Sequence, residues 1–317
     1  MRQNEVRVSV VLSTRNRCEK LRSFLNTMKA NVGPGSIPAE VLIIDNNSND
    51  ATKDVVTEFA SSKSPVVRYL FVSNPGKSRA LNAGIREAKG NIVVFTDDDC
   101  IPGPNWLQAI IEEFDGDPEL SVLGGRVERY DERDLPQAIL LSRSRVLVTN
   151  ISQICETPTI IGANMAFTKA ALAGAGGFDP FLGPGTLCKA DEDLDLIYRS
   201  HKKKLKIVYS PQVMVYHNHG RRTELDENRT SYAYALGRGA LYIKYMLRLD
   251  LQIARIALKE LYGLTKTLTK GILTRRTFTY HRLALPALFL GAIYYCRARL
   301  LPELVTKVML PECTHAH

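Results

Sequence analysis

The chain has 317 residues, of which 45% are hydrophobic and 24% are charged, with 21 Gly and 15 Pro. These values are ordinary for a folded protein and exclude collagen-like, low-complexity and disordered classes. The length allows one large α/β domain, or one such domain with an appendage. The six cysteines include no CxxC pair, so neither a zinc ribbon nor a small disulfide scaffold is indicated and a reducing compartment fits.

Short β-branched apolar runs predict buried strands along the first half of the chain. They are residues 6–13, 40–45, 66–71, 91–97 and 120–125. Helix-like stretches lie between them, at 18–30, 51–62, 78–89 and 104–114. This alternation predicts an α/β domain with an open, mainly parallel sheet flanked by helices. We expect this domain to cover 1–220, in two halves (1–125 and 126–220), and 221–317 to form a helical tail.

No export signal or standard membrane span is visible in the sequence. The first apolar run is short and has charged residues on both sides, unlike a secretory signal. The longest apolar segment, 283–296, has 14 residues, fewer than the ~20 that a spanning helix needs. We therefore expect a cytoplasmic protein, held peripherally on the cytoplasmic face of a membrane if the tail binds lipid.

The net charge of +9 lies entirely in the tail. Residues 1–220 hold 26 Lys/Arg and 26 Asp/Glu, whereas 221–317 hold 16 and 7. Six basic residues share an arc of about 80° on one predicted helix face. They are Lys244, Arg248, Arg255, Lys259, Lys266 and Lys270.

A broad apolar face lies opposite this basic stripe. Its members are Ile243, Leu247, Leu251, Ile253, Ala254, Ile256, Leu258, Leu261, Leu264 and Leu268. Such a helix can lie in an anionic membrane interface, with 244–300 as the contact region. It can equally pack on the protein's own core with its basic side chains in solvent. Nucleic acid fits less well, because no aromatic stacking platform accompanies the charges.

Polar side chains follow the predicted strands where ligands bind in open α/β sheets. Asp97, Asp98 and Asp99 end the fourth strand. Three adjacent carboxylates repel one another unless they are solvated, protonated or bound to cations. Alternation along the strand can direct Asp97 and Asp99 to one side, as a site for Mg²⁺ or Mn²⁺. A solvated acidic turn is the alternative.

Three further motifs carry side chains that could bind phosphate, act as a general base or ligate a metal. Lys77 and Arg79 follow a glycine turn and can contact phosphate oxygens, or can simply begin a surface helix. The acidic run 191–195 precedes a helix, where its members can cap the helix or supply a general base. His217 and His219 share one side of a predicted strand and can ligate a metal, donate to a phosphate or lie on the surface.

The chain resembles the inverting family 2 glycosyltransferases of GT-A fold over about residues 6–219. The matching stretches are VSVVLSTRNR, VLIIDNNSND, NPGKSRALNAGIREAKGNIVVFTDDDCIPGPNWL, IIGANMAFTKAAL, GGFDPFLGPG, ADEDLDLIYR and VYHNH. The resemblance implies a metal-dependent enzyme that moves a sugar from a nucleotide-sugar donor to an acceptor hydroxyl, in surface polysaccharide or glycolipid synthesis. It makes 1–125 the nucleotide-sugar half and 126–220 the acceptor half.

The resemblance also implies a role for each matching residue. Asp193 would be the base and Glu192 its acceptor-orienting neighbour. The donor would contact Thr14, Asn16, Asp45, Lys77, Arg79, Asp97 and Asp98. Metal ligands would be Asp97, Asp99, His217 and His219. The acceptor side would include Gly162, Asn164, Phe178 and Asp179. Many relatives carry Arg where this chain has Leu81, so Lys77 or Arg79 would substitute.

Three rival functions stay open at this stage. A transferase acting on polyprenyl phosphate would suit a membrane-facing tail, although an ionised acceptor needs no strong base. A sugar nucleotidyltransferase would need a Gly-rich N-terminal phosphate loop, which VVLSTRNR lacks. A non-catalytic sugar-binding module is opposed by carboxylates at each expected position.

Overall fold

A computed structural model of the chain describes residues 6–31, 37–60, 65–273 and 279–301, without the side chains of 270–273 and 279–282. It divides into two compact units. The first contains residues up to Phe178 and the segment 193–223, and the second contains 179–192 and the residues from 224 onward. The sequence indicates a boundary near residue 220 but gives no sign that the segment 179–192 belongs to the second unit.

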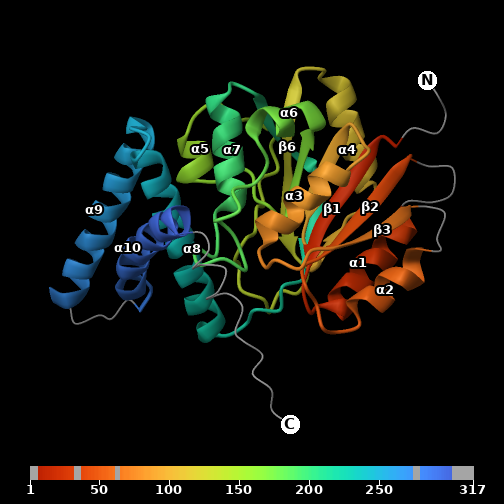
Figure 1. The fold of residues 1–317 in the computed structure, drawn as a ribbon. Coiled ribbons are helices and arrows are strands. Elements are labelled where there is room, and N and C mark those ends of the chain that lie inside the picture. The colour runs from red at the N-terminus through yellow and green to blue at the C-terminus, as the bar shows by residue number, and fades with distance from the viewer. Residues whose placement is uncertain (1–5, 32–36, 61–64, 274–278, 302–317) are drawn as a thin grey trace, which may run out of the picture. The chain divides into compact units, whose positions relative to one another are not determined.

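Nine strands form one sheet in the described part of the first unit, in the order β3-β2-β1-β4-β8-β6-β9-β5, with β7 paired to β9 (Figure 1). The strands are β1 (Val8–Thr14), β2 (Ala39–Asp45), β3 (Val66–Phe71), β4 (Ile92–Thr96), β5 (Cys100–Pro102), β6 (Leu120–Arg129), β7 (Val146–Leu147), β8 (Asn164–Thr168) and β9 (Lys206–His217). The four strands from β3 to β4 pair in parallel, and β8 runs antiparallel to both β4 and β6. The predicted α/β class is confirmed.

Helices follow most strands of the first unit and cover its sheet. They are α1 (Cys18–Asn31), α2 (Thr52–Ala60), α3 (Lys77–Glu87), α4 (Trp106–Gly116), α5 (Ser152–Cys155), α6 (Lys169–Ala175) and α7 (Glu192–Lys202). Helix α1 shows why: its apolar residues recur at helical spacing, and Leu21, Phe24, Leu25 and Met28 are all buried. Strand β2 is buried along its whole length, as expected for a central parallel strand. These apolar faces form one core around the sheet.

The second unit is built from three long helices, α8 (Glu224–Met246), α9 (Leu251–Leu273) and α10 (Thr279–Leu300). A Cβ added to Gly239 would lie 1.9 Å from the Leu288 carbonyl oxygen, and one added to Gly291 would lie 2.0 Å from that of Leu236. Both glycines therefore let α8 and α10 approach backbone to backbone. The segment 179–192 packs on them through Leu182, whose buried side chain joins a small apolar cluster with residues of α8 and α10.

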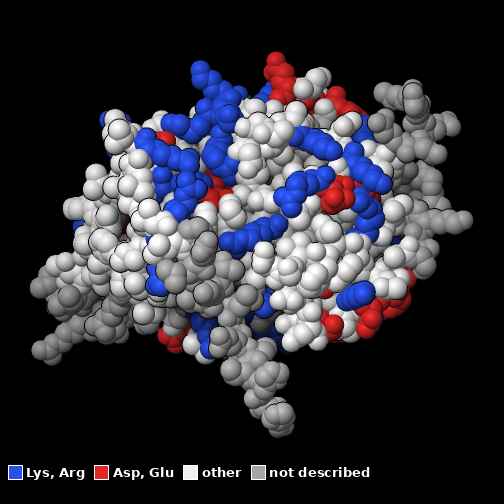
Figure 2. All heavy atoms as spheres, viewed as in Figure 1, with Lys and Arg blue, Asp and Glu red and all other residues white. Residues whose placement is uncertain are grey.

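Helix α10 is the one described helix that meets the length and hydropathy of a membrane span, over Leu283–Leu300. One third of that window is buried inside the protein, and core helices of soluble proteins have the same properties. Figure 2 shows that Lys and Arg are spread over much of one face of the molecule, whereas Asp and Glu gather in small groups.

Candidate functional site

The polar residues that follow β1, β2 and β4 meet at one edge of the sheet. Thr14 and Asp45 are register partners at the ends of β1 and β2. The Thr14 hydroxyl donates a hydrogen bond of 2.7 Å to Oδ2 of Asp98, just beyond β4. The parallel order of these strands therefore brings together residues that are up to 84 positions apart in the chain.

Asp45 is held as a buried acceptor at the end of β2. The backbone N–H of Ser48 donates to one carboxylate oxygen at 2.8 Å, and the Tyr69 hydroxyl donates to the other at 2.7 Å. Burial and the Asp45 carboxylate raise the pKa of Tyr69, so that the hydroxyl stays protonated as a donor. Beside this pair, Asn16 accepts a hydrogen bond of 2.8 Å from the Asn49 backbone N–H, which joins the loops after β1 and β2.

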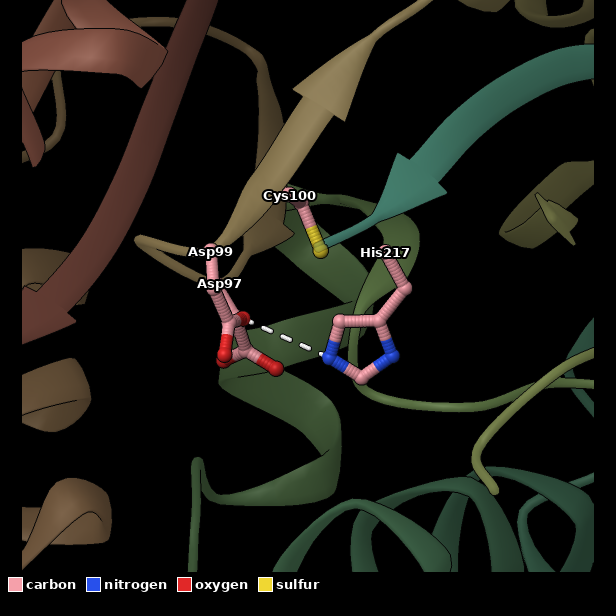
Figure 3. A group of neighbouring side chains, drawn as sticks. All are labelled: Asp97, Asp99, Cys100 and His217. Carbon is pink, nitrogen blue, oxygen red and sulfur yellow. Dashed lines mark ion pairs between the residues drawn. The ribbon is translucent and has the colours of Figure 1, made fainter. Parts of the chain in front are cut away.

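Asp97, Asp99, Cys100 and His217 form a compact cluster beyond β4 (Figure 3). One possible ligand atom from each lies within 4.8 Å of the others. Strands β5 and β9 build this geometry, because Cys100 and His217 are antiparallel register partners. His217 Nε2 lies 3.3 Å from Asp99 Oδ1, and both side chains are almost completely buried.

Each of the three carboxylates has a fixed cation beside it. Arg17 bridges Asp98 and Asp99, with Nη–Oδ distances of 2.6 and 3.1 Å. Lys77 Nζ lies 2.5 Å from Asp97 Oδ1. Burial raises the pKa of Asp98 to about 6 in spite of Arg17. Burial also acts to raise the pKa of Asp99, but the hydrogen bond and charge of His217, with Arg17, hold it well below its usual range.

Asp98→Asn should therefore stabilise the metal-free protein at high pH. The folded-state pKa of Asp98 is about 6, above its ordinary 3.8, so ionisation weakens the fold progressively as pH rises from 4 to 6. At about 1.4 kcal/mol per pKa unit, a neutral Asn should gain up to about 3 kcal/mol at pH 8 and nothing near pH 3.5. Urea unfolding in EDTA at both pH values measures this, with the exposed Asp54→Asn as control. Equal effects of Asp98→Asn at the two pH values would contradict the assignment.

The donor atoms of the cluster fit a hard divalent cation. Carboxylate oxygens suit Mg²⁺ and Mn²⁺, and an imidazole nitrogen is acceptable to Mn²⁺. The Nδ1–H of His217 points to the Ala138 carbonyl at 3.4 Å, which leaves Nε2 directed at Asp99. The Cys100 thiol is fully buried, and burial raises its pKa well above the ordinary value, so it stays protonated and is a poor ligand. The set that fits is Asp97, Asp99 and His217.

His219 lies outside this cluster, two residues beyond the end of β9 at His217. Its Nε2 lies 3.1 Å from the Leu135 carbonyl, and its Nδ1 accepts the Arg221 backbone N–H at 3.0 Å. The two imidazole rings meet edge to face at 4.9 Å between centroids. Because both ring nitrogens of His219 are already bonded, this residue is placed to position His217 rather than to bind an ion.

Asp193 is the second residue of α7 and is linked through Gly162 and Ala163 to the end of β4. Its Oδ2 accepts the Gly162 backbone N–H at 2.6 Å and its Oδ1 accepts the Leu194 N–H at 2.8 Å. One residue beyond Gly162, the Ala163 carbonyl accepts the Thr96 hydroxyl at 2.9 Å. Asp193 is half-buried, so part of its carboxylate is accessible.

The other carboxylates of the acidic run 191–195 are buried, and two of them form ion pairs with arginines. Asp195 is fully buried and pairs with Arg199 at 2.8 Å. Glu192 is 5% exposed and belongs to the second unit, as does Asp191, which pairs with Arg238 at 2.9 Å. The accessible carboxylate of this run in the first unit is therefore that of Asp193.

The other residues expected on the acceptor side lie mostly in packed interiors. The Asn164 side chain is buried, and its Oδ1 accepts a hydrogen bond of 3.0 Å from Trp106 Nε1. Phe178 is buried edge to face against Phe95. Asp179 belongs to the second unit, where it pairs with Lys244 at 2.7 Å. On the donor side, Arg79 donates to the Pro75 carbonyl at 2.8 Å.

Sequence reasoning missed Arg17, Tyr69 and Cys100. A signal existed for Arg17, because it follows the polar end of the first strand and immediately precedes the next helix. No local pattern indicates that Tyr69 in β3 reaches Asp45, since that contact depends on the register of β2 and β3.

The family of the chain follows from its match to a known sequence family. The sequence model of Glycosyl transferase family 2 matches residues 9–174, which carry every strand from β1 to β8. The chain belongs to glycosyl transferase family 2. The resemblance inferred from the sequence motifs is confirmed.

Related proteins match parts of this family 2 chain. Glycosyltransferase AglE of Haloferax volcanii is 31% identical over 121 residues, which is 38% of this chain and 39% of AglE. The poly-beta-1,6-N-acetyl-D-glucosamine synthase of Staphylococcus aureus is 25% identical over 188 residues, 55% of this chain and 42% of that protein. The chain thus spans less than half the length of these relatives.

A solved structure supports the GT-A fold of this family 2 chain. The mannosyltransferase PcManGT from Pyrobaculum calidifontis, determined in complex with GDP-Man and Mn²⁺, has a TM-score of 0.61 at 19% identity. The match covers 95% of this chain and 89% of PcManGT. The agreement is one of fold.

Proposed function

We propose that this chain is a metal-dependent inverting glycosyltransferase that moves a sugar from a nucleotide-sugar donor to an acceptor hydroxyl. The observation that carries the proposal is the half-buried Asp193 carboxylate, tied by Gly162 and Ala163 to the strand end that bears Asp97 and Asp99. A base and a charge-stabilising cluster are the two components that a single displacement at an anomeric carbon requires.

The donor's nucleoside would lie over the ends of β1 and β2. Thr14 and Asp45 are held there by neighbours, with Asn16 in the adjoining loop. Asp45 presents acceptor oxygens suited to ribose hydroxyls. Asp97 and Asp98, with the cations Lys77 and Arg79, would contact the ribose and the diphosphate of the donor.

Lys77 would exchange one anion for another when donor binds. Its Nζ contacts Asp97 at 2.5 Å and is only partly exposed, so a diphosphate oxygen could take the place of that carboxylate. Arg17 bridges Asp98 and Asp99 and stays to balance these buried charges. Both cations thus keep the three carboxylates close together before any ligand is present.

Asp97, Asp99 and His217 would hold Mg²⁺ or Mn²⁺. The bound ion supplies positive charge to the leaving diphosphate. His219 keeps the His217 ring in place through edge-to-face contact, while the Ala138 carbonyl fixes the His217 Nδ1–H. PcManGT was solved with Mn²⁺ and GDP-Man, which supports a divalent ion and a nucleotide sugar as ligands of a protein of this fold.

Asp193 would accept the proton of the attacking hydroxyl. Two backbone N–H groups, from Gly162 and Leu194, donate to its carboxylate and fix its orientation. As the sugar–oxygen bond to the acceptor forms, the bond to the diphosphate breaks and the proton passes to Asp193. Attack from the side opposite the diphosphate inverts the anomeric centre.

A nucleotide screen tests the proposed donor class. With Mn²⁺ present, UDP-, GDP- or dTDP-sugars of one base should raise the melting temperature, because a ligand that binds only the folded state stabilises it. The same donor should release its nucleoside diphosphate slowly, with water as acceptor. Failure of all three classes to bind or to be hydrolysed would contradict the proposal.

The proposed acceptor is a hydroxyl group of a growing surface polysaccharide or glycolipid. The relative from Staphylococcus aureus is named as a synthase of poly-beta-1,6-N-acetyl-D-glucosamine, in which sugar hydroxyls are the acceptors. An accessible carboxylate at Asp193 also favours a hydroxyl over the already ionised oxygen of a polyprenyl phosphate.

A further inference from the structure

Exposed large apolar side chains of the second unit include several along α10, among them Phe289 and Ile293, and a second group around the turn from α8 to α9. The turn from α8 to α9 and the first half of α9 carry six large apolar residues with exposed side chains. They are Met246, Leu247, Leu249, Leu251, Leu258 and Tyr262. We call this set the leucine surface.

The tip of the turn is the most exposed part of the leucine surface. Leu247, Leu249 and Leu251 are 67%, 85% and 69% exposed. Leu249 also has a φ of 57°, in the left-handed region that β-turn glycine or asparagine usually takes. A large apolar side chain at such a position gains nothing from the protein's own core.

The structure divides the apolar face that the sequence pattern suggested for lipid: Leu247, Leu251 and Leu258 of that face are exposed and belong to the leucine surface. Ile253, Ile256 and Leu264 are buried, and α9 packs against α8 and α10. For these three residues, packing on the protein itself is the correct alternative. The side chains left outside are Leu251, Leu258 and Tyr262, which fall within about 40° of one another around the helix.

Basic side chains border the leucine surface. At 100° per residue, Arg255, Lys259 and Lys266 lie along α9 directly beside its exposed apolar stripe, and all three are exposed. Arg248 is exposed between the leucines of the turn. Lys244 is different, because it is buried with Asp179.

Two acidic residues of this region, Asp250 and Glu260, are partly buried. Asp250 caps the start of α9, accepting the Gln252 backbone N–H at 3.1 Å. Glu260 accepts the hydroxyl of Tyr242. Neither is among the exposed residues of 246–269, so the leucine surface combines outward apolar groups with a positive rim.

We propose that the leucine surface docks on an anionic phospholipid bilayer. The leucines would enter the boundary between headgroups and acyl chains, while Arg248, Arg255, Lys259 and Lys266 contact lipid phosphates. Charge argues against a second copy of this chain as the occupant, since a twofold contact would face the same cations with one another. This inference does not depend on the proposed sugar transfer.

Vesicle flotation of the full chain tests the proposal. Wild-type protein should float with vesicles of 70% phosphatidylcholine and 30% phosphatidylglycerol. The variant Leu247→Ser/Leu249→Asn/Leu251→Ser should bind them at least about 30-fold more weakly, because it removes most of the inserted apolar area. Asn is chosen at 249 because it tolerates positive φ.

Further variants test whether the positive charges of the rim contribute to binding and whether binding is specific to the leucine surface. Arg255→Gln/Lys259→Gln/Lys266→Gln should lower vesicle affinity by about tenfold in 0.1 M salt and much less in 0.5 M salt. Two matched sets in the first unit should bind like wild type: the exposed apolar residues in Val66→Ser/Phe71→Ser/Leu141→Ser, and the exposed cations in Lys29→Gln/Lys53→Gln/Lys203→Gln. Circular dichroism and melting temperature check folding of each variant.

Three results would overturn the proposal. The first is wild-type protein that does not float with anionic vesicles. The second is a folded leucine variant that floats as well as wild type. The third is a wild-type dimer that the leucine substitutions dissociate while vesicle binding persists, because the leucine surface would then be an interface between copies.

Discussion

Asp193→Asn should lower the turnover rate by about 10³-fold or more while donor affinity stays within twofold of wild type. Loss of a positioned general base typically costs 10²–10⁴-fold. Asn keeps the shape of the side chain and one oxygen that can still accept the Gly162 N–H, so the loop geometry should persist. Release of nucleoside diphosphate at saturating donor gives the rate, and calorimetric titration gives the affinity.

The matched control for this change is Asp54→Asn, at an exposed position of α2, which should leave both quantities unaltered. An Asp193→Asn variant with the wild-type turnover rate would remove Asp193 from the role of base. A loss restricted to hydroxyl acceptors, with transfer to polyprenyl phosphate intact, would instead support the phosphate-acceptor alternative.

Lys244→Met should destabilise the protein by about 3–5 kcal/mol, the usual cost of leaving one member of a buried ion pair alone. Asp179 accepts Lys244 Nζ at 2.7 Å, the Tyr295 hydroxyl at 2.9 Å and the Phe181 N–H at 3.0 Å. Burial acts to raise the pKa of Asp179, but the charge and hydrogen bond of Lys244, together with the bonds from Phe181 and Tyr295, lower that pKa. The stabilisation is therefore present above the unfolded-state pKa near 4 and is lost as pH falls through the folded-state value.

The double variant Asp179→Asn/Lys244→Met should recover most of this loss, because it leaves no unpaired charge. Urea unfolding at pH 7 measures both variants, with the exposed Lys203→Met as control. Strictly additive effects of the two substitutions would contradict a direct pairing. The same result would reopen an acceptor-side role for the Asp179 carboxylate.

The sheet and family could be predicted because their signals are local. Continuous apolar runs mark β1, β2 and β4, and each is followed by polar residues at the edge where parallel strands converge. Asp97 and Asp99 were therefore recognisable as neighbours of Thr14 and Asp45 before any coordinates. The helix periodicity of α1 is equally local, since one face supplies its whole buried surface.

Other features depend on contacts between distant segments. His217 and His219 have the same side in a two-residue period, yet the carbonyls of Ala138 and Leu135 give their rings different partners. Asp179 looks like a loop carboxylate until Lys244, 65 residues later, is seen beside it. An amphipathic pattern likewise shows that α9 has an apolar face, but only the packing with α8 and α10 shows what covers it.

The rate of donor cleavage in metal-stripped protein, titrated with Mn²⁺, tests the proposed chemistry most directly. Wild-type protein should be inactive in excess EDTA and regain activity saturably with Mn²⁺. Asp99→Asn should need at least about tenfold more Mn²⁺ for half of its maximal rate, because it removes one charged ligand. Full wild-type activity in excess EDTA would contradict a metal-assisted transfer at Asp97, Asp99 and His217.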